Sequence, residues 1–470
     1  MHPLLLMDFK ELNMEQRPAN KLSSESILEA LGTYNQMARS VWPPFNSDAG
    51  YDEISLRVKR GEGAYLEDCR GSLLFDGISG LWNVPLGYSN EIIKEAIRSQ
   101  LVELPSCSLI VGETEIANEA ASLILQRCEM DGGRVFFSND GSEAIESAIK
   151  IARHHFYAQG RANKKIILSC RDSYHGMTMG ALSVTGISED KWQFGSPLPD
   201  IYQVASPYDL LENDPCKFVY EILNAIRFYG KENIAAIVLE PVFAVAGIVK
   251  IPPGTLKDIS NICKSNDILL IIDEVTTGVY RGSSHFLFSA GHDVIPDIVV
   301  LAKALTNGYV PLGATVAAKH IFDSVERSGV GLMHGHTFSG NPLAMAACRA
   351  MLSQVASGES DVVALHLANA ATNYIGKSKA FKGFRVSQAM LGVDLDLELE
   401  NMTTAGVSNL AKKIRITCRE KGYVVRPTYG GKTFNFLPMY ISSEDQIVGL
   451  IRSFVNVAEE MINEMRDASR

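Results

Sequence analysis

Two charged residues stand directly after apolar runs that are typical of buried strands. Asp273 ends the run Ile268–Asp273, and Lys303 follows the run Ile298–Ala302. Burying a lysine is costly unless the lysine is paired or neutral, and a neutral, desolvated lysine is what Schiff-base chemistry needs. Structural interpretations stay open, because the aspartate could cap a helix or form an ion pair, and the lysine could reach into water. Together the two residues indicate a site at the carboxyl edge of a sheet, where open parallel sheets bind ligands.

A short polar segment, Asn139–Ala144, lies between a strand-like run and a helical pattern. In it, Gly141 and Ser142 would present free backbone N–H groups at a helix N-terminus, which favours an anion such as phosphate. Neither the glycine-rich dinucleotide fingerprint nor the G-x-x-x-x-G-K-[ST] motif occurs in the chain. The segment therefore indicates a phosphate site of another kind, with a plain capped helix as the alternative.

Three further segments carry polar or aromatic residues that chemistry could use. Tyr174 follows a strand-like run and could stack on a planar cofactor. The neighbouring His175 could be catalytic, although we favour a structural role for it. Glu240 places another carboxylate at a strand end. His334 and His336 suggest a metal site, but no third ligand of suitable spacing is present. We therefore predict no metal.

A phosphate cradle, an aromatic plate, a strand-end acid and a strand-end lysine are together the parts of a pyridoxal 5′-phosphate (PLP) site. The acid would keep the pyridine nitrogen protonated, so that the ring can act as an electron sink. The sequence thus predicts PLP as the cofactor, held as a Schiff base on Lys303.

The elements that must position these residues alternate between strand and helix. Continuous apolar runs without polar alternation are typical of strands buried on both faces, and helical stretches near 217–228 and 255–266 lie between them. This pattern predicts an α/β fold with a mainly parallel sheet. The runs are Arg134–Ser138, Ile166–Cys170, Ala235–Glu240, Ile268–Asp273 and Ile298–Ala302.

The two ends of the chain have a different pattern. A hairpin is predicted around Arg70-Gly71, a strand–helix–strand piece from about 383 to 441, and a final helix that begins with a capping box of Ser443 and Gln446. We predict an N-terminal segment (1–75) that belongs to a small domain, a large PLP-binding domain (76–335) and a C-terminal small domain (336–470).

Composition excludes several classes of protein. The 470 residues carry a formal net charge of −10, which argues against a nucleic-acid binder. The eight cysteines are scattered, as expected for reduced thiols in a cytoplasmic protein. No stretch is long and apolar enough to span a membrane, and the first residues lack the basic region of a signal peptide. We therefore expect a cytoplasmic protein without nucleic-acid or membrane partners.

The motifs occur in an order that resembles the class-III aminotransferases, PLP enzymes of fold type I. The similarity covers nearly the whole chain from about residue 40, and the combination of Asp-Glu-Val with Ala-Lys is its most specific part. The matching segments are Gly80–Asn83, Ser138–Lys150, Tyr174–Gly176, Glu240-Pro241, Asp273–Val275, Ala302-Lys303 and Gly335–Thr337.

The resemblance implies a role for each residue around the cofactor ring. Lys303 would form the Schiff base and act as the base in proton transfer. Asp273 would pair with the ring nitrogen, and Glu240 would lie near the phenolic edge. Val275 and Tyr174 would pack against the two faces of the ring. The fold implied is a large domain with a mainly parallel, seven-stranded sheet and a small α+β domain formed by the termini.

The resemblance also implies contacts with the phosphate and the substrates. Gly141 and Ser142 would bind the phosphate, and Thr337 would reach the phosphate of the neighbouring subunit of a homodimer. Trp82 would line the substrate pocket, and Arg426 would be a mobile arginine that takes the substrate carboxylate. The sequence near Asp273 departs from the usual pattern of the family at one position, because Thr276 occupies the place where the family usually has Gln.

The activity that follows is the transfer of an amino group from an amine or ω-amino acid to a 2-oxo acid. Two alternatives remain open: another class-III reaction of the aminomutase or dialkylglycine decarboxylase type, and a non-catalytic α/β binding protein.

Overall fold

A computed structural model describes residues 40–46, 48–195, 197–204, 206–208, 214–396 and 403–468. The chain divides into two compact units, residues 1–55 and residues 56–470. Helix α2 (Asp48–Ile54) belongs to the first unit, and all elements discussed below belong to the second. The first residues of the chain, where no signal peptide is expected, lie outside the described residues.

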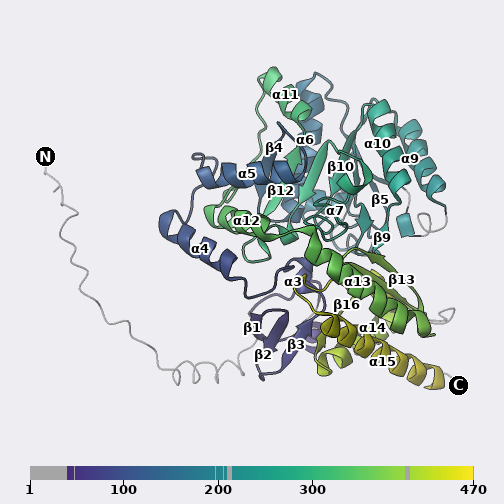
Figure 1. Cartoon of the computed structure of the whole chain (residues 1–470). Coiled ribbons are helices and arrows are strands. Elements are labelled where there is room, and N and C mark those ends of the chain that lie inside the picture. The colour runs from purple at the N-terminus through teal and green to yellow at the C-terminus, as the bar shows by residue number, and fades with distance from the viewer. Residues whose placement is uncertain are drawn as a thin grey trace, which may run out of the picture. The chain divides into compact units, whose positions relative to one another are not determined.

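A seven-stranded sheet forms the centre of the second unit (Figure 1). All neighbouring strands are parallel except β12, which runs antiparallel to β11 and β4. The predicted seven-stranded, mainly parallel sheet is therefore confirmed. Its order is β4 (Arg134–Ser138), β12 (Gly313–Ala317), β11 (Ile298–Leu301), β10 (Leu269–Asp273), β7 (Ile234–Leu239), β5 (Ile166–Cys170) and β6 (Ile201–Val204).

Helices cover both faces of this sheet, which explains the continuous apolar runs in the sequence. Every residue of β7, β10 and β11 is buried. Helix α6 (Gly141–Ala158) packs over β10–β12, whereas α10 (Pro253–Ser265) packs on β10 and α9 (Pro215–Tyr229) on β6. Helix α5 (Glu115–Arg127) packs on β4 and α7 (Met179–Val184) on β5 and β6, whereas α11 (Lys319–Ser328) packs on α6.

A second sheet combines three strands from the N-terminal part of the described chain with one strand from its C-terminal part. The predicted hairpin is present as the antiparallel pair β2 (Tyr65–Asp68) and β3 (Leu73–Asp76), and β1 (Val58–Glu62) pairs with β2. β15 (Tyr423–Val424) adds to this sheet parallel to β3, with Val424 opposite Asp76. This pairing aligns the turn after β3 with the strand that follows β15.

A third, fully antiparallel sheet has the order β13 (Phe381–Ser387), β14 (Met390–Leu395), β17 (Thr433–Phe436) and β16 (Arg426–Thr428). The strand–helix–strand prediction for 383–441 was wrong in its topology. Helix α14 (Thr404–Glu420) does lie between the strands in sequence, but β14 pairs directly with β17 in antiparallel fashion. A short hairpin of β8 (Val242–Phe243) and β9 (Val249–Lys250) forms a separate two-stranded sheet.

The capping box of the last helix, α15 (Glu444–Ala468), is confirmed. Ser443 Oγ accepts a hydrogen bond from Gln446 N at 3.3 Å, and Gln446 Oε1 accepts one from Ser443 N at 2.8 Å. Figure 1 shows α15 beside α14 and α13 (Ser357–Tyr374). The remaining helices are α3 (Ser79–Trp82), α4 (Glu91–Glu103) and α12 (Pro342–Gln354). The division of the chain at residues 76 and 336 stays a prediction.

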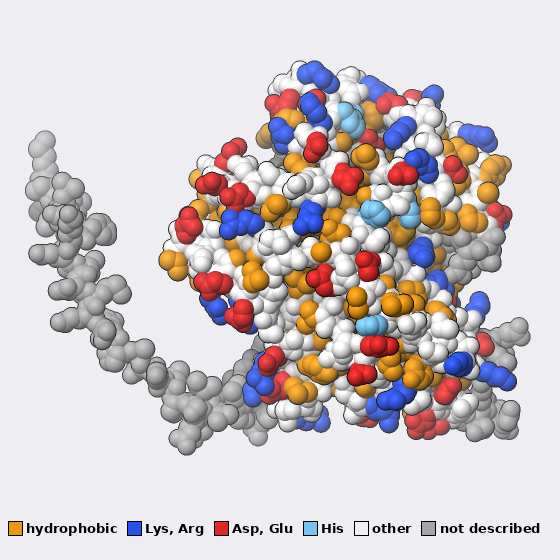
Figure 2. All heavy atoms as spheres, viewed as in Figure 1, with side chains coloured by type: hydrophobic (Ala, Val, Ile, Leu, Met, Phe, Trp, Pro, Cys, Tyr) orange, Lys and Arg blue, Asp and Glu red, His pale blue; other side chains and the backbone are white. Residues whose placement is uncertain are grey.

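Two surface properties bear on function. On the face drawn in Figure 2, acidic and basic side chains are interspersed rather than gathered into patches of one sign. In the described part of the chain, no helix combines the length and the apolar character that crossing a membrane requires.

Candidate active site

Lys303 and Asp273 lie at the carboxyl ends of neighbouring parallel strands, as their positions in the sequence predicted. Asp273 ends β10 opposite Val300 of β11, and Lys303 begins the 3₁₀ turn that follows β11. The backbone of Lys303 has a φ of 22°, an uncommon conformation for a side-chain-bearing residue. Burial lowers the pKa of the Lys303 ammonium, Asp273 and Glu240 oppose this shift, and the charge of Arg426 adds to it. The neutral amine is thereby favoured.

Asp273 is held by two hydrogen-bond partners. Its Oδ2 lies 2.8 Å from Nδ1 of His175, and its Oδ1 accepts a hydrogen bond from Val275 N at 3.0 Å. Both side chains of the Asp273–His175 pair are almost completely buried. His175 Nε2 is buried and has no partner among the residues that the structure describes. His175 therefore contacts the candidate catalytic acid through Nδ1, and its other ring nitrogen stays available.

Glu240 connects the end of β7 to the segment that carries Tyr174. Its carboxylate accepts hydrogen bonds from Tyr174 N at 2.8 Å and from Ala244 N at 3.3 Å. Burial raises the pKa of Glu240 to about 7, and the neighbouring charge of Asp273 contributes in the same direction. This carboxyl group is therefore poised to hold or release a proton near neutral pH.

The phosphate cradle predicted at Gly141 and Ser142 is the N-terminus of α6. Asp140 is the N-cap residue, and its side chain accepts a hydrogen bond from Glu143 N at 2.9 Å. A Cβ atom on Gly141 would lie 3.2 Å from Cγ1 of Val275, so glycine allows the helix end to approach the end of β10. Ser142 Oγ accepts a hydrogen bond from Met177 N at 3.2 Å. The N-terminus of α6 therefore lies beside the end of β10, the strand that carries Asp273.

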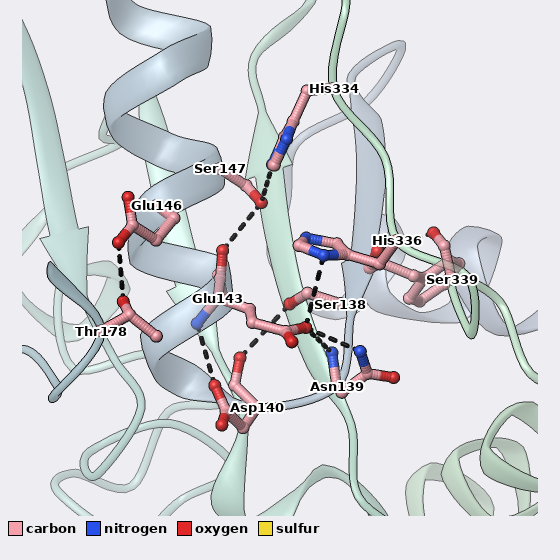
Figure 3. A network of polar contacts seen from close by, with 12 residues as sticks. Ser138, Asn139, Asp140, Glu143, Glu146, Ser147, Thr178, His334, His336 and Ser339 are labelled. Atoms are coloured by element: carbon pink, nitrogen blue, oxygen red, sulfur yellow. Dashed lines mark hydrogen bonds and ion pairs between the residues drawn. The ribbon is translucent and has the colours of Figure 1, made fainter. Parts of the chain in front are cut away.

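A polar network joins the start of α6 to the loop 334–340 (Figure 3). Glu143 accepts hydrogen bonds from Asn139 N and Nδ2 at 2.8 and 2.7 Å, and its carboxylate lies 3.6 Å from Nδ1 of His336. His334 Nε2 lies 2.9 Å from Ser147 Oγ, and the His334 ring stacks on Phe136. The two histidines therefore fix the loop to the helix.

Within the described ranges, no group of three His, Cys, Asp or Glu side chains could hold a metal ion. Thr337 follows directly after His336, is exposed, and forms no hydrogen bond with another residue that the structure describes.

Trp82 and Arg426 lie together because they follow paired strands. Gly77 N donates to Val424 O at 3.1 Å, so the turn after β3 runs beside the start of β16. The Trp82 ring is 4% exposed, and its centroid lies 5.7 Å from Cζ of Arg426 and 5.6 Å from Nζ of Lys303. These distances are within the range of cation–π attraction. The structure thus brings both predicted substrate residues to Lys303.

Asp76 was not identified from the sequence, although it organises the turn that carries Trp82. Its fully buried carboxylate accepts hydrogen bonds from Ile78 N at 3.0 Å, Gly80 N at 2.6 Å and the Tyr88 hydroxyl at 2.6 Å. Ser79, Gly80 and Trp82 all have positive φ angles, a backbone that needs such support. An aspartate directly after a strand-like run was the signal, the same one that singled out Asp273.

Comparison with known proteins finds similarity over most of the chain. The family model described as aminotransferase class-III matches residues 46–458. An adenosylmethionine-8-amino-7-oxononanoate aminotransferase of Staphylococcus aureus is 29% identical, with 90% of this chain and 96% of that protein aligned. An omega-aminotransferase of Caulobacter vibrioides is also 29% identical, over 88% of this chain and 96% of that protein.

The fold is similar to that of solved transaminases. The crystal structure of an amine transaminase from an uncultivated Pseudomonas species, in its PLP-bound form, has a TM-score of 0.84 and 30% identity, and covers 90% of this chain and 98% of that one. The chain therefore belongs to the class-III aminotransferases, PLP-dependent enzymes of fold type I, as the order of its motifs predicted.

Proposed function

We propose that this enzyme transfers an amino group from an amine or ω-amino acid to a 2-oxo acid, with PLP held covalently on Lys303. The observation that carries the proposal is the partly buried Lys303 at the end of β11, next to the buried Asp273–His175 pair, where removal from water lowers the pKa of its amine. The named activities of the relatives, an omega-aminotransferase and an amine transaminase, support the same reaction class.

The residues at this place fit PLP in chemistry. Buried polar atoms that lack a partner in the described structure, His175 Nε2 and Trp82 Nε1, border the group formed by Asp273 and Lys303. Asp273 would hold the ring nitrogen, Glu240 the phenolic edge, and Val275 and Tyr174 the two faces. The α6 N-terminus with Gly141 and Ser142 would hold the phosphate, since free N–H groups and the helix dipole favour an anion.

When bound, PLP supplies an electron sink that makes the Cα–H bond of an attached amine acidic. Lys303 moves the proton away from Cα, and the neutral amine needed for this is favoured by burial. Asp273 stabilises positive charge on the ring nitrogen, and His175 in turn orients Asp273. The buried walls formed by Trp82 and Glu240 exclude water from the reacting atoms.

Arg426 binds the substrate carboxylate in this proposal. Burial lowers the pKa of its guanidinium, although an arginine remains charged at neutral pH. No carboxylate of the described chain lies within ion-pair distance of it. The Trp82 ring therefore provides the attraction that keeps this cation in the site until an anion arrives.

A homodimer is part of the proposal. Two adjacent segments expose large apolar side chains: Ile110 and Val111 are 72% and 86% exposed, and Met333 and Phe338 are 96% and 59% exposed. The segments touch, because Leu109 N donates to Ser339 O at 3.3 Å. A second copy would cover this surface and bring its Thr337 to the phosphate. Both the dimer and a cytoplasmic location stay predictions.

A single-turnover assay tests the reaction type. A carboxylate-free amine or an ω-amino acid should convert bound PLP to pyridoxamine phosphate, and a 2-oxo acid should restore PLP. Release of CO₂ would favour the decarboxylase type. Isomerised substrate without net amino transfer would favour an aminomutase.

A further inference from the structure

Thr276 is the one hydrogen-bond partner that the described structure gives to the Lys303 amine. Thr276 Oγ1 lies 3.0 Å from Lys303 Nζ, and the Thr276 side chain is largely buried. The residue stands three positions after Asp273, in the turn that leaves β10. The roles given above to the cofactor-binding residues do not use this buried hydroxyl, which contacts the group that would move the proton.

The turn that carries Thr276 is fixed by a fully buried carboxylate. Glu274 accepts hydrogen bonds from the Thr277 hydroxyl, from Phe288 N at 3.1 Å, and from Ser289 N at 2.9 Å. Gly278 N donates to Glu274 O at 2.8 Å, which closes the turn. Because a β-branched side chain is also stiff about χ1, the Thr276 hydroxyl is held in place before Lys303 reacts.

A hydroxyl group suits an amine that changes its protonation state. It can accept a hydrogen bond from the ammonium or from the neutral amine, and it can donate to the nitrogen lone pair. A flexible lysine without such a partner can rotate about its terminal bonds, and its lone pair then points away from the substrate for part of the time. An accepting hydroxyl fixes one N–H bond and thereby aims the lone pair.

We propose that Thr276 is a positioning residue for Lys303: its hydroxyl accepts a hydrogen bond from Nζ once the amine is free, and so directs the lone pair at the proton to be moved. When bound, PLP would take up the electron pair of the broken Cα–H bond, and Lys303 would take the proton as a new N–H bond on Nζ. Lys303 would then hold that proton until it gives it up and regains the neutral amine. This inference rests on the proposed function, because Lys303 is the base there.

The test compares three variants of the full-length enzyme. Thr276→Val keeps the shape of the side chain and removes the hydroxyl, whereas Thr276→Ser keeps the hydroxyl. Thr277→Val is the matched control, because this neighbouring threonine bonds to Glu274 instead of Lys303, and the bonds from Phe288 N, Ser289 N and Gly278 N that also hold the turn remain in this variant. Single-turnover rates are measured for both half-reactions, and the isotope effect is measured in the amine half-reaction with donors that carry hydrogen or deuterium at Cα.

Thr276→Val should slow both half-reactions by a similar factor of roughly 10 to 100, the loss expected for one hydrogen bond that involves a charged group. The deuterium isotope effect should rise, because proton transfer becomes more strongly rate-limiting, while the KM of each substrate stays nearly unchanged. Thr276→Ser should retain most of the rate. Thr277→Val should lower the melting temperature without changing the isotope effect.

A second readout does not depend on turnover. An ammonium bonds to a hydroxyl more strongly than a neutral amine does, so Thr276→Val should lower the pKa of free Lys303. The pH dependence of PLP capture by the apoenzyme should then shift to lower pH in Thr276→Val and not in Thr277→Val.

Unchanged rates and isotope effects in Thr276→Val would overturn the inference. So would equal losses in the two Val variants, or a Ser variant as slow as the Val variant, since these results indicate a structural role only. A wild-type chain that forms no adduct on Lys303 would overturn the proposed function together with the inference. A wild-type adduct with unaffected Thr276→Val kinetics would overturn the inference alone.

Discussion

Replacing Arg426 by alanine should impair one half-reaction and spare the other. In the structure the guanidinium is mostly buried against Trp82 and has no carboxylate partner within the described residues. A 2-oxo acid brings the missing anion, which can form two parallel hydrogen bonds with the planar guanidinium. A carboxylate-free amine brings no such group, so its binding does not depend on Arg426.

The size of the effect follows from the interaction that is lost. A hydrogen bond to a charged group contributes about 1.5–3 kcal/mol, and side-chain ordering and desolvation offset part of a bidentate pair. A net loss of about 1.4–4 kcal/mol corresponds to a decrease in kcat/KM for the 2-oxo acid of roughly 10- to 1000-fold. The corresponding change for a carboxylate-free amine should stay within about threefold, less than 1 kcal/mol.

Stopped-flow absorbance measures the two half-reactions separately in wild type, Arg426→Ala and Arg426→Lys. The lysine variant keeps the charge and loses the bidentate geometry, so it should fall between the other two. The carboxylate-free amine serves as the internal control for damage to the site. Equal losses in both half-reactions, or no loss in either, would show that Arg426 does not bind the carboxylate.

Three further predictions concern the acid, the buried glutamate and the dimer. Asp273→Asn removes the charge beside His175 and should slow both half-reactions roughly 10²- to 10³-fold, while PLP stays bound. A stopped-flow rate close to that of the wild type would contradict a role of Asp273 in stabilising charge on the ring nitrogen. Because burial raises the pKa of Glu240 to about 7 from 4.5, folded apoenzyme binds a proton that the unfolded chain has already released. Its free energy of unfolding should therefore fall as the pH rises from about 4.5 to 7. Urea titrations at these two pH values should show this decrease to be about 3 kcal/mol smaller in Glu240→Gln than in the wild type. An equal decrease in both proteins would contradict the raised pKa. In sedimentation velocity the wild type should be a dimer, and the double variant Met333→Glu/Phe338→Glu should be a monomer that retains PLP less well. A dimeric double variant would show that this surface is not the interface.

The elements that carry the core chemistry were predictable because their signals are local. A strand buried on both faces reads as a continuous apolar run, so the strands before Asp273 and Lys303 were visible in the sequence. Because these two strands are parallel neighbours, the side chains of Asp273 and Lys303 lie at the same edge of the sheet. The polar start of α6 likewise indicated an anion site from Gly141 and Ser142 alone.

Other features depend on contacts between distant segments and leave no local signal. The pairing of β15 with β3 places Arg426 beside Trp82, although these residues are far apart in the sequence. The antiparallel pairing of β14 with β17 could not be distinguished from a strand–helix–strand unit, because both contain a helix between two strands. The contact of Thr276 with Lys303 depends on a rotamer and a turn that residue type does not specify.

The attachment of PLP to Lys303 is the central claim, and one measurement tests it most directly. The purified enzyme with PLP should absorb near the blue edge of the visible spectrum and lose that band on borohydride reduction. Peptide mass spectrometry should then find the reduced pyridoxyl group on the peptide that contains Lys303, and Lys303→Ala should give no adduct at this site. A reducible adduct on another lysine in the wild type, or at the native site in Lys303→Ala, would contradict the account.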